Sequence, residues 1–587
     1  MKKRLIVLIL TLALVSTLAT FVSAQGGPGQ GGIVFLNSIV SDPPTYIPMI
    51  YSDNDSQVIF KWMYPNVFGV NPATGAFEPG FADSLAIDWS FDETGTVLTA
   101  SLRQDAFWSD GVQITANDFI WMLEALRSGL LSGPRATETW ESLDDGTPGS
   151  GTLVDAVALD DFTVQLTFAA PDCNALANVF DYVVPSHIFE EDFGDDLAAM
   201  NDEPRYLPGV YFGPFVEPEL AAGDRVSLVA NQEYPDAELG YVSPSELVEL
   251  IIPDQDVAIE RFRAGDITMA GIPATYQAEF AADPDYQTYR FPRQGYVFYA
   301  FNQANPDNPA DAYDEDGNYL GIDPHPVLGD RLVRQAITYS VNMDAIIENY
   351  LDGNAVRVGI PSIPSSWDFD ADLLYPFDPV MAAQLLDEAG WVMGDGEFRV
   401  CQGCAYTEID PAYEGTEMVV TLNADESGTE DSRQMIEFIA QSMRDVGINA
   451  QVNFIDWGSA FVPALLNQEF DMAILAWNLG LPLDPDNSNI FSTQADVLGG
   501  FNFVSYHNEE IDQLYLDARN PALTDGCTVE GRLPFYARAN EILFEDVPYM
   551  FMYANLSMAA AHNYVEGWDP VVFSRTWDLD TWAIDQP

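Results

Sequence analysis

The stretch from Thr99 to Leu126 reads TASLRQDAFWSDGVQITANDFIWMLEAL and predicts a strand, a turn and a helix in direct succession. Ser109-Asp110-Gly111 is typical of a tight turn, because glycine reaches positive φ without steric cost. Thr115 and Asp118 have the spacing of a capping box, which satisfies free backbone N–H groups at the start of a helix. The helix that follows has one apolar face, made by Ile120, Leu123 and Leu126.

The chain around this stretch is too long for a single hydrophobic core, because cores stop growing at roughly 250–300 residues. It has 587 residues, of which 48% are hydrophobic and 19% are charged. This is the composition of a globular protein and not of a disordered one. We therefore expect two or more lobes.

The first 24 residues (1–24) predict a secretory signal peptide. MKKR supplies positive charge, an apolar run follows, and Val22-Ser23-Ala24 suits signal peptidase. The alternative is an uncleaved anchor, because the run approaches the roughly 20 residues that span a bilayer. Gln25 stands where a lipoprotein has cysteine, and the glycine-rich residues 25–32 predict a flexible linker. We expect an exported, soluble protein, periplasmic or extracellular, without a lipid anchor.

Negative charge dominates the chain, which has 23 basic and 91 acidic residues. Lys2 and Lys3 fall within the expected signal peptide, so Lys61 is the only lysine of the exported part. Such a chain repels nucleic acid and anionic membrane surfaces, so we expect neither as a partner. The acidic residues are scattered along the sequence, which predicts a solvated surface.

Four cysteines occur in this exported chain, where disulfides are stable. They are Cys173, Cys401, Cys404 and Cys527. The CQGC spacing favours a local Cys401–Cys404 disulfide over a metal site, because zinc usually needs two further close ligands. The alternative is a bond from Cys527 to one of these two residues.

The second half alternates helix and strand patterns, which predicts an α/β lobe. Residues 377–391 and 431–447 read as helices, the first with Asp378 as N-cap and Gly390 as its stop. Residues 448–457 and 470–477 read as strands. Two apolar strands, Gly295–Asn302 and Pro548–Asn555, enclose this block and predict a hinge between lobes.

Enzyme motifs are not found in the sequence. The four histidines do not form a zinc motif, and neither a nucleophile elbow nor a phosphate-binding loop is present. We therefore expect no catalytic site, metal or cofactor. The loop Asp311–Asp323 has the oxygen donors of a calcium site, but Tyr319 occupies the position where an EF-hand has glycine. An exposed loop is the favoured interpretation.

Trp477 ends an apolar strand, and the carboxyl ends of strands are where α/β sheets bind ligands. Packing in the core is the alternative role of this residue.

The opening stretch also resembles a known signature. LRQDAFWSDGVQITANDF resembles the signature of the extracytoplasmic solute-binding proteins of family 5, the oligopeptide and dipeptide class that serves ABC importers. Further similar segments follow in the order of the family across nearly the whole exported chain. They are Val184–Glu190, Gly213–Tyr234, Gly329–Ile347, Asn467–Trp477 and Tyr536–Tyr553.

The resemblance implies a two-lobed periplasmic-binding-protein fold of type II, cluster C, with an extra inserted domain and two hinge strands. The boundaries it implies are lobe I at 33–70, 207–296 and 554–587, inserted domain II at 71–206, and lobe III at 297–553. The opening stretch would then lie in the inserted domain, away from the ligand.

The resemblance also implies capture of a small oligomeric ligand by a monomer that closes and presents it to permease and ATPase subunits. Ligand backbone would pair with Ser52, Asp53 and Asn54 on one lobe and with Ala476, Trp477 and Asn478 on the other. Peptide-binding relatives hold the ligand's ammonium with Asp three residues after the tryptophan, where this chain has Gly480. Asp484, in a loop one residue longer, is the replacement to consider.

Oligopeptide is therefore the leading substrate, and oligosaccharide is the alternative within the same family. A secreted hydrolase with an acidic cleft and a receptor that only reports its ligand are the alternatives from other classes.

Overall fold

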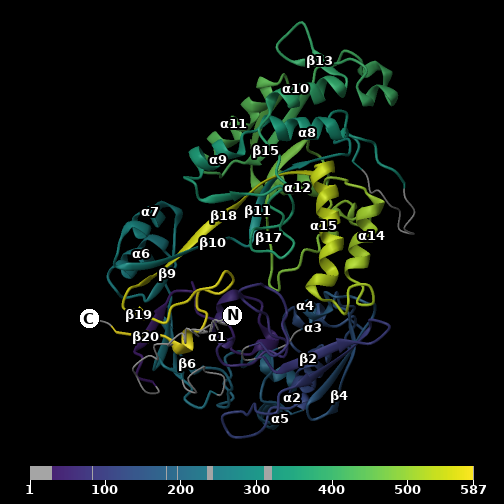
Figure 1. Cartoon of the computed structure of the whole chain (residues 1–587). Helices are drawn as coiled ribbons and strands as arrows, with labels where there is room; N and C mark the ends of the chain where they lie inside the picture. Colours follow the sequence, from purple (N-terminus) through teal and green to yellow (C-terminus); the bar gives the residue numbers. More distant parts are fainter. Residues whose placement is uncertain are drawn as a thin grey trace, which may run out of the picture.

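The computed structural model describes residues 29–81, 84–179, 182–194, 196–234, 242–309 and 320–585. It confirms a mixed α/β protein of two lobes, in which one long strand, β18, runs from the upper lobe to the lower body (Figure 1). The expected signal peptide lies outside the described residues, as does most of the loop Asp311–Asp323. Among the described helices, none is both long and apolar enough to cross a membrane.

One four-stranded sheet of the lower body has the order β1-β8-β7-β6. β1 is parallel to β8, with Ile33 opposite Glu246, and the other pairs are antiparallel. The elements of this part are β1 (Ile33–Leu36), α1 (Asn54–Phe60), β6 (Phe215–Ala221), β7 (Arg225–Ala230) and β8 (Glu246–Leu250).

The opening stretch forms part of a second, antiparallel sheet of order β2-β3-β5-β4. The predicted capping box is confirmed: Asp118 Oδ2 accepts from the Thr115 backbone N–H at 2.8 Å. Asp118 Oδ1 also accepts from the Ser186 hydroxyl at 2.7 Å, so one carboxylate joins two helices. The elements are β2 (Ala86–Phe91), β3 (Val97–Leu102), α2 (Ala116–Arg127), α3 (Arg135–Thr139), β4 (Leu153–Asp160), β5 (Thr163–Phe168), α4 (Ala175–Asn178) and α5 (Ser186–Phe193).

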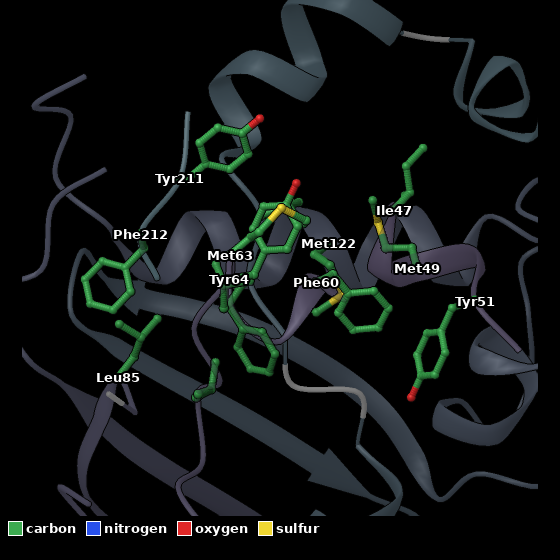
Figure 2. Packing of buried hydrophobic residues seen from close by; sticks show 14 of the residues in the cluster. Ile47, Met49, Tyr51, Phe60, Met63, Tyr64, Leu85, Met122, Tyr211 and Phe212 are labelled. Atoms are coloured by element: carbon green, nitrogen blue, oxygen red, sulfur yellow. The ribbon is translucent and has the colours of Figure 1, made fainter. Parts of the chain in front are cut away.

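These two sheets share one hydrophobic core. Figure 2 shows Phe60 and Met63 in the same cluster as Met122 of α2. The rings of Phe68 and Phe119 also meet edge to face across the two parts, 6.4 Å apart. Because interiors are close-packed, parts that share a core move as one body.

The upper lobe has its own sheet, in which β15 is parallel to β16 and β17, and β17 is antiparallel to β11. The Asp378 cap is confirmed by bonds from the Val380 and Met381 backbone N–H groups. The strands are β11 (Gly295–Phe301), β12 (Ala355–Arg357), β13 (Trp391–Met393), β14 (Arg399–Cys401), β15 (Val419–Asp425), β16 (Asn449–Ile455) and β17 (Met472–Asn478). The helices are α8 (Arg331–Ser340), α9 (Met343–Tyr350), α10 (Pro379–Glu388), α11 (Glu430–Asp445), α12 (Val462–Leu466), α13 (Ser488–Phe491), α14 (Glu509–Ala518) and α15 (Val529–Asp546).

The cores of the upper lobe are separate from the core of the lower body. Residues between Tyr296 and Ala554 supply two hydrophobic clusters, to which the rest of the chain adds only Phe573 among the described buried residues. The molecule therefore contains two separately packed bodies.

Strand β18 (Tyr549–His562) belongs to both bodies. Its first half pairs with β11 and β12, and its second half pairs with β10 (Tyr286–Pro292) and β9 (Met269–Ile272). Beside the lower half of β18 lie α6 (Gln255–Arg263) and α7 (Ala274–Ala282) (Figure 1). The chain thus passes between the bodies near Arg293 and near Asn555, whose backbone groups are bonded at 2.7 Å.

Short elements complete the fold. They are β19 (Val565–Glu566), β20 (Ala583–Ile584), the π-helical turn Trp457–Phe461, and the 3-10 turns Pro48–Ile50, Leu197–Asn201, Ala405–Glu408, Pro411–Tyr413, Thr493–Ala495 and Leu579–Thr581.

Two disulfides account for all four cysteines. Cys401 and Cys404 form the local bond that the CQGC spacing favours. Cys527 pairs with Cys173, so the alternative of a bond to the CQGC pair is wrong. The sequence separation of 354 positions between Cys173 and Cys527 explains why spacing gave no signal for this pair. The bond joins the sheet domain of the opening stretch to the upper lobe.

Candidate functional site

A cavity of about 680 Å³ lies where the two bodies meet. Most of its lining comes from the lower body, between Tyr51 and Phe81, between Arg135 and Tyr182, and between Ser574 and Asp580. The upper lobe contributes Leu481 and Pro482, from the loop after β17. The volume lies within the roughly 300–1,000 Å³ typical of ligand pockets.

Aromatic rings form much of the cavity wall. Phe81 and Trp577 are stacked, with ring centroids 5.5 Å apart. Stacked rings that are only partly buried offer apolar faces to a ligand, and polar groups can bond at the ring edges. The aromatic residues of the lining are Tyr51, Trp62, Phe68, Phe77, Phe81, Tyr182, Tyr234 and Trp577.

Two cations line the cavity, and they differ in their partners. Arg135 pairs with Glu138 at 2.9 Å, and its guanidinium lies 4.6 Å from the centre of the Tyr51 ring. Lys61 follows the last residue of α1 and lies 4.9 Å from the centre of the Trp62 ring. Desolvation lowers the pKa of Lys61, although Glu249 partly opposes this, and Arg575 lowers the pKa further.

Ser52, Asp53 and Asn54 lie directly after the cavity residue Tyr51. Ser52 and Asn54 are exposed. Asp53 is the N-cap of α1, because its carboxylate accepts from the Ser56 backbone N–H at 2.7 Å. Its side chain therefore has a structural role. The backbone is extended at Tyr51 and Asp53, on either side of Ser52, whereas Asn54 is the first residue of α1.

The end of β17 has one edge without a neighbouring strand. β11 pairs with β17 from Met472 to Asn478, whereas β15 pairs only with Met472 and Ala473. No described strand covers the other edge at Ala476 and Asn478, and both residues are exposed. An unpaired edge offers N–H and C=O groups for an added strand.

Trp477 belongs to an aromatic cluster of the upper lobe and is only partly buried. Its ring is stacked near Phe298 and Phe503, with centroids 6.2 and 6.1 Å away, and meets Phe501 edge to face. The side chain supports the end of β17 from one face and does not contribute to the cavity lining that is described.

Asp484 and Asp486 are held by arginines. Arg532 binds Asp484 at 2.6 Å, and Arg519 binds Asp486. Burial opposes the charge of Arg532, but Asp484 beside it raises the pKa of Arg532 above its usual value. Both carboxylates are therefore neutralised by the upper lobe itself.

Gly480 lies between β17 and the cavity residues Leu481 and Pro482. It is exposed, and a Cβ built there would meet no atom within 4 Å. Position 480 is thus open towards solvent and carries no acid.

The Cys173–Cys527 bond is part of a junction beside the cavity. The Cys173 backbone N–H donates to the Arg519 carbonyl at 2.7 Å, and Arg532 donates to the Asn174 amide oxygen at 2.8 Å. Helix α4 begins at the next residue, and its residues Leu176, Ala177 and Asn178 line the cavity. The junction therefore fixes one wall of the cavity to the upper lobe.

Sequence reasoning missed most of the cavity residues. Lys61 had a visible signal, because it is the only lysine outside the expected signal peptide. Arg135, Trp62 and Trp577 had none, because their approach depends on how distant segments pack. Among the described residues, no cluster of three His, Cys, Asp or Glu side chains is placed to hold a metal ion.

Comparison with known sequences matches residues 80–497 to the model of the bacterial extracellular solute-binding proteins, family 5. The oligopeptide-binding protein AppA of Bacillus subtilis is 24% identical over 569 residues, which cover 96% of this chain and 93% of AppA. Heme-binding protein A of Haemophilus influenzae is 24% identical over 415 residues, 70% of this chain and 66% of the relative.

Comparison with solved structures shows the same fold. AppA of Bacillus subtilis in complex with a nonapeptide superposes with a TM-score of 0.61 at 21% identity, covering 95% of this chain and 100% of AppA. The periplasmic murein tripeptide-binding protein MppA, in its unliganded open form, gives 0.71 at 17% identity, covering 95% and 98%.

Proposed function

Because the chain belongs to family 5 of the bacterial extracellular solute-binding proteins, we propose that it captures oligopeptides and delivers them to the permease and ATPase subunits of an ABC importer. The relative AppA is named as an oligopeptide-binding protein, and its solved structure holds a nonapeptide. The observation that carries the proposal is the cavity of about 680 Å³ between two separately packed bodies. The activity is binding, and catalysis has no part in it.

Strand addition supplies the affinity. The ligand backbone pairs with the uncovered edge of β17 at Ala476 to Asn478 and with the backbone at Ser52 to Asn54, where α1 begins. Main-chain bonds of this kind do not depend on ligand side chains, which enter the aromatic cavity. Trp477 acts by holding the end of β17 in place.

Closure occurs about the two passages between the bodies, near Arg293 and Asn555. Lobe I comprises 33–70, 207–296 and 554–587, domain II comprises 71–206, and lobe III comprises 297–553. Lobe I and domain II move together because they share one core, and the Cys173–Cys527 bond limits how far lobe III swings away. The protein acts as a monomer.

Export precedes capture. Signal peptidase cleaves after Ala24, so the mature chain starts at Gln25 with the linker 25–32 and carries no lipid anchor. The intact mass of the exported protein tests this step, because a chain that keeps MKKR would be membrane-anchored.

Oligosaccharide is the second candidate ligand. The stacked rings of Phe81 and Trp577 suit sugar faces, and Gly480 supplies no acid for a peptide ammonium. Mass spectrometry of the ligand released from purified protein decides between the two classes.

Defined peptides test the peptide class directly. Because Asp484 and Asp486 are held by arginines, we expect a free amino terminus to contribute little, so free and N-acetylated forms bind within about tenfold, or ~1.4 kcal/mol. A thousandfold preference for the free form would mean that another acid holds the ammonium. Glu138→Gln, Asp484→Asn and Asp486→Asn would then identify it.

A further inference from the structure

Lys61 is placed in the cavity by the local fold. Helix α1 begins after the Asp53 cap and ends at Phe60, so Lys61 and Trp62 follow at its carboxyl end. Both residues line the cavity, and Lys61 is exposed to it. The only lysine of the exported chain therefore lies where the ligand is proposed to bind.

Lys61 has no ion pair with a carboxylate of the described residues. Within the described part of the chain, no acidic oxygen lies within 4.0 Å of its ammonium. Glu249 is the acid that acts on it from a greater distance, and this residue is 1% exposed and accepts from the Ser38 backbone N–H at 2.9 Å. Arg135, the other cation of the lining, already has Glu138 as its partner.

A second cation, Arg575, adds to the positive charge that acts on Lys61. Arg575 acts on Lys61 as a like charge, and the neighbouring residues Ser574 and Thr576 line the cavity. Arg575 has no ion pair with an acid among the described residues, and its guanidinium lies 5.4 Å from the centre of the Phe291 ring. Arg575 is absent from the cavity lining, so Lys61 and not Arg575 is placed to contact a ligand there.

Basic residues are scarce in this chain, so a cation without an acidic partner is unusual. The chain has 91 acidic residues and 23 basic ones, so an acid is available near almost any surface cation. Leaving a charge unpaired in a desolvated site costs free energy, which a ligand of opposite charge recovers on binding.

We propose that Lys61 binds a carboxylate of the ligand, so that the cavity selects anionic ligands. This inference rests on the proposed function and specifies its substrate class: peptides with a free carboxyl terminus or an acidic side chain. The same carboxylate chemistry occurs in uronic-acid sugars, so the experiment distinguishes these sources.

The first probe is a tryptic digest of casein, offered to the ligand-free protein before and after methyl esterification, which neutralises all peptide carboxylates. Peptides retained after gel filtration are quantified by mass spectrometry. We expect esterification to reduce retention by wild type at least about tenfold, or ~1.4 kcal/mol. We expect less than about twofold reduction for Lys61→Met, and discrimination like that of wild type for Lys61→Arg.

Stability separates binding from a structural role. Lys61→Met removes a desolvated charge and keeps the length of the side chain, so we expect its thermal unfolding temperature to equal or exceed that of wild type. A marked fall in the unfolding temperature, with unchanged discrimination against esterified peptides, would show that Lys61 stabilises the buried carboxylate of Glu249. This result would overturn the inference.

The single lysine offers an independent readout. Reductive methylation with ¹³C-formaldehyde labels Lys61 and the terminal amine, and the Lys61→Arg variant identifies the terminal signal. We expect the ¹³C NMR signal of methylated Lys61 to change its chemical shift when the untreated digest is added, and not when the esterified digest is added.

The outcomes separate this inference from the proposed function. Equal retention of free and esterified peptides would leave peptide capture standing and overturn the role of Lys61. If no peptides are retained, oligogalacturonate and neutral malto-oligosaccharides serve as the second probes. Retention of oligogalacturonate alone would overturn peptide capture and support Lys61, whereas retention of neither sugar would overturn both.

Discussion

The residues at the end of β17 belong both to the core of the upper lobe and to the proposed binding edge. Trp477 packs beside Phe298 and Phe503, and the exposed residues Ala476 and Asn478 flank it on the uncovered strand. Its ring therefore links the core of the upper lobe to the binding edge. Removing the ring should affect both the stability of the lobe and the affinity for ligand.

Trp477→Ala should weaken ligand binding by about 2–3 kcal/mol, because the end of β17 loses its support. Calorimetric titration with the ligand found on the purified protein measures this. Trp391→Ala is the control, because Trp391 lies in the same lobe, is distant in sequence from Trp477 and is only 1% exposed. It should cost about 3–5 kcal/mol of stability and leave the affinity of the folded protein unchanged. Normal affinity of Trp477→Ala would place Trp477 in the core alone.

Gly480→Asp should restore recognition of a peptide ammonium. A Cβ at this exposed position meets no atom within 4 Å, so there is room for a side chain to begin there. We expect the ratio of affinities for free and N-acetylated peptides to rise at least about tenfold, or ~1.4 kcal/mol. Gly480→Asn is the matched uncharged control, and an equal rise in this variant would contradict a charge effect.

At the scale of elements, the strand, turn and helix of the opening stretch serve the fold. Residues 99–126 contribute nothing to the described lining of the cavity, whereas the later elements α3 and α4 of the same domain do. Asp118 explains why the stretch is so regular, because its carboxylate caps α2 and also holds Ser186 at the start of α5.

Asp118→Ala should therefore lower the unfolding free energy by about 2 kcal/mol and leave ligand affinity unchanged. Chemical denaturation and calorimetry measure the two quantities separately. Glu124→Ala, an exposed change on the same helix, should alter stability by less than about 0.5 kcal/mol. A loss of affinity in folded Asp118→Ala would show that the helix positions the cavity wall.

For the whole molecule, the arrangement of cores determines which parts can move. The two sheets of the lower body share a core, and the upper lobe has its own, so we expect opening to occur between these two bodies. We expect the strands that connect them to act as a hinge at one side, and the Cys173–Cys527 bond ties them together beside α4.

Removing this bond should open the ligand-free protein further. We expect the Cys173→Ser/Cys527→Ser double variant to have a larger radius of gyration than wild type in small-angle scattering, and to show greater compaction with ligand. Cys401→Ser/Cys404→Ser is the control, because that bond lies within the upper lobe. An unchanged radius would mean that the bonds of Asn174 with Arg532 and Asp486 hold the bodies together without the disulfide.

The sequence by itself determined the local elements and the fold class. Capping residues such as Thr115, Asp118 and Asp378 act within a few positions of one another, so their effect is readable from spacing. Apolar periodicity likewise indicated the strands and helices of the α/β lobe, and an ordered series of motifs indicated the family.

Only the tertiary structure decided which distant residues meet. The partner of Cys527 lies 354 residues away, and the cavity combines segments near Lys61, Arg135 and Trp577. It also showed that Asp484 is held by Arg532, which a loop alignment does not reveal. Such contacts depend on how separate cores pack against each other, and that packing has no periodic or short-range signal in the chain.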